Sequence, residues 1–123
     1  MKILVVDDDS GIRKLTVNAL TYCVNREILS FGDGLSAWQY LEEGGDADIV
    51  ISDVDMPLMN GFELLSKCKA KWVDNKGASK FFILMSGRMT NEKKAELSGA
   101  DAFLCKPFAI NDLFNIVQCF VVD

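Results

Sequence analysis

The chain has 123 residues, 50% of them hydrophobic, and a formal net charge of −5 with no histidine. This size predicts a single domain over residues 1–123 with a core that needs no disulfide or metal to fold. The acidic balance and the lack of a basic run argue against direct nucleic-acid binding, and the lack of histidine excludes a Ser-His-Asp triad or a histidine-ligated metal on this chain.

Five short runs of aliphatic, β-branched or aromatic residues predict strands. The runs are continuous rather than alternating in polarity, which is typical of parallel strands covered on both faces. They occupy residues 3–6, 27–31, 48–52, 81–85 and 102–105.

Amphipathic stretches between and after these runs predict five helices, because apolar residues recur in them three and four positions apart. The helices are expected at residues 11–24, 34–43, 61–73, 91–98 and 110–121.

In the first helix the apolar stripe is expected to be Ile12, Leu15, Ala19 and Cys23, with Leu20 beside them and Ser10 as N-cap. The fourth helix offers mainly Ala95 and Leu97, so we expect it to pack loosely.

Strict alternation of strand and helix predicts an α/β fold with right-handed crossovers and an open, doubly wound sheet. Such sheets bind ligands at the carboxyl ends of their strands. The polar stretch 74–80 is expected to be a loop before the fourth strand. No apolar run is long enough to cross a bilayer, and no signal peptide is recognisable, so a cytoplasmic protein without membrane contact is expected.

The four cysteines show no paired spacing, which predicts buried, reduced thiols. They are Cys23, Cys68, Cys105 and Cys119.

Polar residues follow four of the predicted strands directly. Asp7 and Asp8 follow the first, Asp53 the third, Ser86 the fourth and Lys106 the fifth. Because the carboxyl ends of parallel strands share one rim, three carboxylates, a hydroxyl and an ammonium are expected in one crevice.

A cluster of this composition predicts a Mg²⁺ and phosphoryl site. Two carboxylates about 4 Å apart repel by roughly 4 kcal/mol at an effective dielectric near 20, so a cation should join them, and Mg²⁺ prefers oxygen ligands. At a rigid strand end, Asp53 could attack phosphorus to form an acyl phosphate, with Lys106 meeting the developing charge and Ser86 donating a hydrogen bond. Asp9 is expected only to cap the first helix.

Four ordered motifs span essentially the whole chain: Val5-Val6-Asp7-Asp8, residues 53–61 (DVDMPLMNG), Met85-Ser86-Gly87, and residues 99–108 (GADAFLCKPF). Together they resemble the response-regulator receiver domain of two-component signalling, in particular the chemotaxis-type receiver. The resemblance implies a flavodoxin-like, five-stranded parallel sheet of order 2-1-3-4-5 with five helices.

The resemblance also implies roles for individual residues. Asp53 would accept a phosphoryl group from a sensor histidine kinase or a phosphotransfer protein. Mg²⁺ would be held by Asp8, Asp53 and the main-chain carbonyl of Asp55, with Asp7 nearby. Lys106 would contact the phosphoryl group. The domain would be a self-modifying phosphoacceptor rather than an enzyme acting on other molecules.

Ser86 and Phe103 would form the switch, and a downstream protein target would bind the face made by the fourth helix, fifth strand and fifth helix. Threonine is commoner than Ser86 in the family, and Phe103 lacks a phenol, so its signal would rest on packing. The resemblance further implies a cis Lys106-Pro107 bond and a backbone turn at Gly61. Asp55 and Arg88 are hypothesised to pair across the entrance and to tune the attack of water on the phosphoryl group.

Three alternatives compete with the receiver interpretation. A haloacid-dehalogenase-like aspartyl phosphatase would use Asp53 and Asp55 as nucleophile and acid, but that family places the pair after its first strand and has a much longer chain. A flavodoxin-like flavin binder would want a Ser/Thr/Gly cradle where this chain has acids. A receiver-like binding module that is not phosphorylated would leave the acid, hydroxyl and lysine set without a role.

Overall fold

The computed structural model describes residues 2–73 and 80–121. Most of the predicted 74–80 loop therefore lies outside the described residues. Five strands and five helices alternate, as predicted. They are β1 (Lys2–Val6), α1 (Ser10–Cys23), β2 (Glu27–Phe31), α2 (Gly34–Glu42), β3 (Ile49–Asp53), α3 (Gly61–Trp72), β4 (Phe81–Ser86), α4 (Asn91–Leu97), β5 (Ala102–Cys105) and α5 (Ile110–Gln118).

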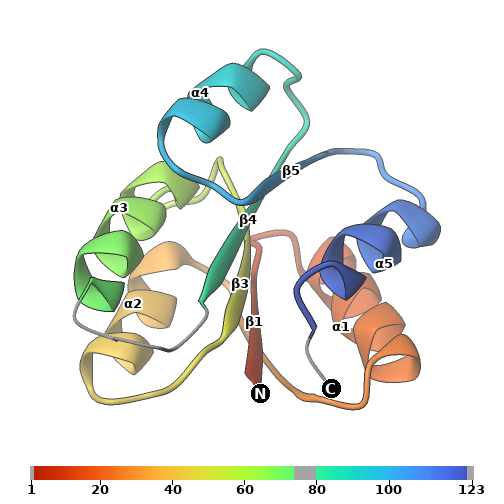
Figure 1. Ribbon diagram of the computed structural model, residues 1–123, viewed down its shortest axis with the longest axis horizontal. Coiled ribbons are helices and arrows are strands. Elements are labelled where there is room, and N and C mark those ends of the chain that lie inside the picture. The colour runs from red at the N-terminus through yellow and green to blue at the C-terminus, as the bar shows by residue number, and fades with distance from the viewer. Residues whose placement is uncertain (1, 74–79, 122–123) are drawn as a thin grey trace.

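All strand pairs are parallel, and the strand order is β2-β1-β3-β4-β5. This confirms the predicted flavodoxin-like, doubly wound sheet. The order reverses between β1 and β3, so the carboxyl ends of these two strands flank the position where such sheets bind ligands. Figure 1 shows α1 and α5 on one side of the sheet and α2 and α3 on the other, with α4 beyond β4 and β5.

The sheet separates two hydrophobic cores, which explains the continuous apolar runs of its strands. On β1, Leu4 and Val6 pack with residues of α2, α3 and α4. Ile3 and Val5 point to the other face, where they pack with residues of α1 and α5. The side-chain period of a strand thus supplies both cores from a single run.

The face that helix α1 presents to the sheet matches the prediction only in part: the expected Leu20 is buried and the expected Ala19 packs against the core. Its buried residues are Thr16 and Leu20, whereas Leu15 is 56% exposed and Cys23 is also exposed. The N-cap is Asp9, whose carboxylate accepts a hydrogen bond from the N–H of Ile12 at 3.1 Å. The capping role of Asp9 is therefore confirmed, and that of Ser10 is wrong because Ser10 is already helical.

Helix α4 is attached to the sheet by few side chains. Among its seven residues, all of them described, only Ala95 is buried, and Leu97 is 78% exposed. The ammonium of Lys94 lies 4.3 Å from the ring centroid of Phe62 on α3, a cation–π contact. The apolar stripe of α4 is thus reduced to Ala95, whereas Leu97 was also expected in it, so loose packing is still expected for this helix.

Two glycines let chain segments come closer than any side chain would allow. A Cβ at Gly61 would collide with the main-chain carbonyl oxygen of Asp53, and one at Gly34 would collide with that of Met59. Neither residue is among those with positive φ. Glycine at position 61 is thus explained by close approach of α3 to the end of β3, rather than by a turn that needs unusual dihedral angles.

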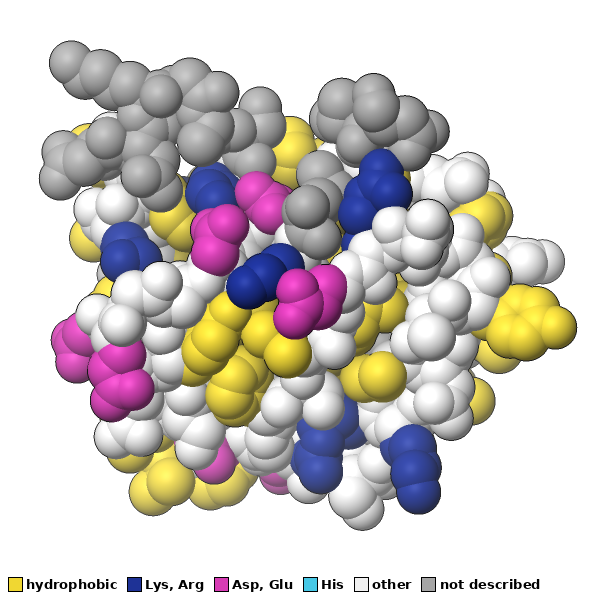
Figure 2. Space-filling model, turned by 90° about the horizontal axis from the view of Figure 1, so that it is seen from below, with side chains coloured by type: hydrophobic (Ala, Val, Ile, Leu, Met, Phe, Trp, Pro, Cys, Tyr) yellow, Lys and Arg dark blue, Asp and Glu magenta, His cyan; other side chains and the backbone are white. Residues whose placement is uncertain are grey.

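The amino edge of the sheet is held by an ionic cluster. The ammonium of Lys80 lies 2.9 Å from a carboxylate oxygen of Asp46 and 3.2 Å from one of Asp48. The second oxygen of Asp48 accepts a hydrogen bond from the N–H of Lys2 at 2.8 Å. Figure 2 shows the molecule from this side, with basic and acidic side chains interspersed around a hydrophobic area.

The four cysteines are free thiols, but the prediction that all are buried is wrong. Cys68 is buried, Cys105 is partly buried, and Cys23 and Cys119 are exposed. Cys23 is the last residue of α1, and Cys119 directly follows α5. Burial raises the pKa of the Cys68 thiol to about 12, so this thiol stays protonated and unreactive. No helix within residues 2–73 and 80–121 is long and apolar enough to span a membrane.

Candidate functional site

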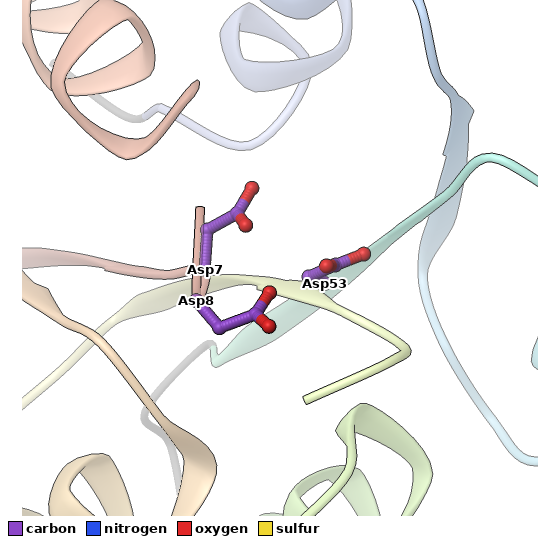
Figure 3. Close-up of side chains that lie close together, drawn as sticks. All are labelled: Asp7, Asp8 and Asp53. Carbon is purple, nitrogen blue, oxygen red and sulfur yellow. The ribbon is translucent and has the colours of Figure 1, made fainter. Parts of the chain in front are cut away.

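Three carboxylates meet at the carboxyl edge of the sheet. Asp7 and Asp8 follow β1 directly, and Asp53 is the last residue of the neighbouring β3. One oxygen from each carboxylate lies within 4.8 Å of the other two, and Figure 3 shows the side chains converging on the same space. The structure therefore brings together acids that are 46 residues apart in the sequence.

Asp7 is fully buried, and both of its carboxylate oxygens are engaged. One accepts a hydrogen bond from the N–H of Asp9 at 3.0 Å, and the other from the ammonium of Lys106 at 2.7 Å. The guanidinium of Arg13 donates to the main-chain oxygen of Asp7 at 2.7 Å, which fixes the turn after β1. Asp8 is exposed, and none of the described residues donates a hydrogen bond to its carboxylate.

Asp53 is only 8% exposed. One of its carboxylate oxygens accepts a hydrogen bond from the N–H of Val54 at 3.0 Å, and the other lies 3.4 Å from the ammonium of Lys106. Burial raises the pKa of Asp53 to about 6; the charge of Lys106 opposes this rise and the charge of Asp7 adds to it. Without a cation, this carboxylate is thus less stable in its charged form than an ordinary aspartate.

Lys106 bridges Asp7 and Asp53 from the end of β5. Its N–H donates to the carbonyl of Ser86 at 2.7 Å, and its bond to Pro107 is cis, as predicted. Burial by itself would lower the pKa of the ammonium, but the hydrogen bond to Asp7 and the charge of Asp53 raise it above its ordinary value. The ammonium therefore stays protonated in the crevice and supplies a fixed positive charge.

Ser86 is the last residue of β4 and is fully buried. Its hydroxyl oxygen accepts hydrogen bonds from the N–H of Arg88 and from the side-chain amide of Asn91, both at 3.0 Å. Asn91 was not predicted from the sequence, because it does not follow a strand directly and belongs to none of the four motifs. The available signal was a side-chain amide at the start of the fourth helix, five positions after the hydroxyl.

The donor set suits a hard divalent cation. The converging atoms are carboxylate oxygens from Asp7, Asp8 and Asp53, and no sulfur or imidazole ligand belongs to this group among the described residues. Mg²⁺ is usually bound by one or two carboxylates together with water and phosphate oxygens. The residues present therefore fit Mg²⁺ in number and in type.

Comparison with known proteins assigns the family. A family model described as the response regulator receiver domain matches residues 3–118. The chain belongs to the response regulator receiver domain family. Chemotaxis protein CheY1 of Helicobacter pylori is 34% identical over 113 residues, which cover 88% of this chain and 86% of that protein. Receivers of this type are signalling domains.

Solved structures agree with this assignment. The chemotaxis protein CheY4 of Vibrio cholerae has a TM-score of 0.82 and 29% identity, covering 98% of both chains. The response regulator protein TrrA of Thermotoga maritima, in complex with Mg²⁺–BeF, has a TM-score of 0.84 and 28% identity, also covering 98% of both chains.

At the mouth of the receiver's crevice, the carboxylate of Asp55 lies outside the three-acid group. One of its oxygens is 3.9 Å from Nε of Arg88, and the two side chains are 61% and 73% exposed. The two residues are thus close enough for the hypothesised pairing, although an ion pair this exposed adds little stability. A ligand role for the main-chain carbonyl of Asp55 stays a prediction.

Phe103 of the receiver lies on β5 and is partly buried against the core beneath α3 and α4. It lines a small hollow of about 170 Å³, together with Ala95 and Glu92 of α4. A change in the position of this ring would therefore change its contacts with α4. Whether Phe103 acts as a switch stays a prediction.

Proposed function

We propose that this receiver domain, spanning residues 1–123, accepts a phosphoryl group on Asp53 from a phosphohistidine of a sensor kinase or a phosphotransfer protein. The observation that carries the proposal is the placement of the Asp53 carboxylate between two further acids and the Lys106 ammonium. Residues 1–123 include no histidine, so the donor histidine lies outside this domain.

The chemistry is a transfer between two nucleophiles. A carboxylate oxygen of Asp53 attacks phosphorus, the bond between phosphorus and the donor imidazole nitrogen breaks, and that nitrogen keeps the electron pair. Lys106 neutralises the charge that develops on the phosphoryl oxygens, and the Ser86 hydroxyl donates a hydrogen bond to one of them. The product is an acyl phosphate on Asp53.

Mg²⁺ would be held by Asp8 and Asp53 and by the main-chain carbonyl of Asp55. Both oxygens of Asp7 already accept hydrogen bonds, so Asp7 is better suited to act through a water molecule. The ion would supply positive charge to the phosphoryl oxygens. The Mg²⁺–BeF complex of TrrA supports this assignment by similarity of fold.

The donor protein would dock on an apolar area beside the crevice. A hollow of about 440 Å³ is lined by Lys106, Gly87 and apolar residues from α1 and the loop before α5, namely Ile12, Leu15, Pro107 and Phe108. A second hollow, of about 310 Å³, shares Leu15 and extends to Tyr22 and Ile110. Because the first hollow includes Lys106, a helix seated there could present its histidine to Asp53.

The output of the domain would be a change in binding of a downstream protein at α4, β5 and α5. Phosphorylation replaces one negative charge on Asp53 with about two and adds three acceptor oxygens, so the crevice must rearrange. Ser86 and Phe103 would carry this change to α4, whose packing is weak. We further propose that the protein works in the cytoplasm without binding nucleic acid or a membrane directly.

Incubation with Mg²⁺ and acetyl phosphate, followed by intact-mass measurement, tests the proposal. We expect a labile gain of one phosphoryl group on the wild type and none on Asp53→Asn. Neutralising the exposed Glu96 by Glu96→Gln is the matched control and should leave the gain unchanged. A gain that persists in Asp53→Asn, or the absence of any gain on the wild type, would contradict the proposal.

A further inference from the structure

The hydroxyl of Ser86 is held from two sides by the segment that leads into α4. Its oxygen accepts hydrogen bonds from the N–H of Arg88 and from Nδ2 of Asn91, each at 3.0 Å, and the residue is fully buried. A hydroxyl has two acceptor positions and one proton. Both acceptor positions are therefore filled, and the orientation left to its proton is largely fixed.

The side-chain amide of Asn91 donates a hydrogen bond to the end of β4 rather than to its own helix. It is the first residue of α4, and the residue before it, Thr90, makes no capping hydrogen bond through its side chain. The amide group of Asn91 instead reaches back to the end of β4. This hydrogen bond directly joins the amino end of α4 to the hydroxyl at the end of β4.

Few other side-chain contacts hold the amino end of α4 in place. Within α4, all of which is described, Ala95 is the single buried residue, and the cation–π contact of Lys94 with Phe62 leads to α3 rather than to the sheet. Met89, in the connection before α4, is 69% exposed. The position of the amino end of α4 therefore depends strongly on the bond between Asn91 and Ser86.

We propose that Asn91 is a positioning residue that holds the Ser86 hydroxyl and the amino end of α4 together in the unphosphorylated protein. The inference rests on the proposed function, in which Ser86 turns toward a phosphoryl group on Asp53. A shift of about an ångström would carry a 3.0 Å contact beyond hydrogen-bonding distance. Phosphorylation would then release α4, because the movement of the hydroxyl toward the phosphoryl group would break its hydrogen bond with Asn91.

This arrangement predicts that loss of the Asn91 amide favours the activated state. In Asn91→Ala, amide exchange in α4 should be faster in the metal-free protein, because the helix has lost its link to β4. The affinity for beryllofluoride with Mg²⁺ should rise about five-fold, the worth of one neutral hydrogen bond that no longer has to be broken. Lys93→Ala, at an exposed position of the same helix, is the control and should change neither quantity.

A double-mutant cycle separates this role from a general effect on helix stability. In a Ser86→Ala background the hydroxyl is missing, so adding Asn91→Ala should not change the beryllofluoride affinity or the α4 exchange rate further. Equal effects of Asn91→Ala with and without Ser86 would overturn the inference. So would wild-type exchange and affinity in Asn91→Ala.

The two hypotheses fail differently. If the wild type neither binds beryllofluoride nor gains a phosphoryl group, the proposed function fails, and the coupling of Asn91 to phosphorylation fails with it. If the wild type does both and Asn91→Ala behaves identically in both assays, only the role of Asn91 is wrong.

Discussion

The ammonium of Lys106 lies closer to Asp7 than to the predicted phosphoacceptor, at 2.7 Å from an oxygen of Asp7 and 3.4 Å from one of Asp53. Asp7 is fully buried, so this contact compensates a charge that water does not reach. Lys106 therefore has a structural role before any phosphoryl group arrives.

Replacing Lys106 with methionine should destabilise the metal-free protein by about 3 kcal/mol, because Asp7 would keep a buried charge without its partner. Urea denaturation at neutral pH measures this. Lys2→Met, which breaks an ion pair to Glu27 with side chains 37% and 58% exposed, is the control and should cost less than about 1 kcal/mol. Equal costs for the two substitutions would show that the Asp7 contact is unimportant.

The raised pKa of Asp53 predicts a stability that depends on pH. Folding raises this pKa from 3.8 to about 6, so the folded chain binds the proton more tightly, and the resulting stabilisation is lost as pH rises through 6. Asp53→Asn removes the loss. In metal-free buffer it should stabilise the protein by about 3 kcal/mol at pH 7.5, by about half as much at pH 5, and hardly at all near pH 3.

Thermal denaturation of wild type, Asp53→Asn and the Glu96→Gln control across this pH range gives the measurement. A stabilisation by Asp53→Asn that does not vary with pH would argue that the burial of the charged carboxylate is not its cause.

Asp8 should contribute more to Mg²⁺ binding than its neighbour Asp9. Asp8 belongs to the three-acid group and has an open carboxylate, whereas Asp9 caps α1. Asp8→Asn should weaken Mg²⁺ binding by about ten-fold or more in calorimetric titration, and it should raise the melting temperature of the metal-free protein by relieving repulsion. Asp9→Asn retains a capping side chain and should bind Mg²⁺ almost as the wild type does. Similar losses in both would place the ion elsewhere.

The contact between Asp55 and Arg88 should affect the lifetime of the phosphorylated state rather than folding. At 3.9 Å and largely exposed, the pair should change the free energy of unfolding by less than about 1 kcal/mol when broken. Because both side chains stand at the mouth of the crevice, Asp55→Asn and Arg88→Ala should each alter the rate at which water removes the phosphoryl group. Unchanged dephosphorylation half-lives in both variants would refute a role for the pair.

Leu58 carries local backbone strain. Its φ of 69° lies in the left-handed region, and its side chain is 76% exposed, so little packing compensates the strain. Leu58→Asn should raise the free energy of unfolding by about 0.5 to 1 kcal/mol, because asparagine tolerates this region better. The same replacement at Leu97, which is 78% exposed but helical, should stabilise nothing. Chemical denaturation of both variants decides the point.

There is a physical reason why the sequence predicts both the sheet and the meeting of the site residues at its carboxyl edge. Strands buried on both faces are continuous apolar runs, and their ends are marked by the first polar residue, such as Asp7 after Val6 or Lys106 after Cys105. The parallel topology then brings these ends together without further information.

The predictions failed where a helix has more than one apolar face, or where a polar side chain has several possible hydrogen-bond partners. Helix α1 has apolar residues on more than one side, so periodicity predicted Leu20 correctly but could not exclude the exposed Leu15 and Cys23. The contacts of Arg13 with Asp7 and of Asn91 with Ser86 depend on how loops return toward the sheet. Hydrophobic patterns do not encode such polar contacts.

Gly61 contains no reactive atom, yet its place against the carbonyl of Asp53 constrains the chemistry as firmly as any acid does. A methyl group there would push the end of β3 away from the start of α3, and the nucleophile would move with it. In a saturation library selected for signalling, position 61 should accept no other amino acid, while the exposed Asp8 could still be sampled as asparagine at reduced output. Tolerance to mutation at a position in this domain would then depend on the room around its backbone as much as on whether its side chain takes part in the reaction.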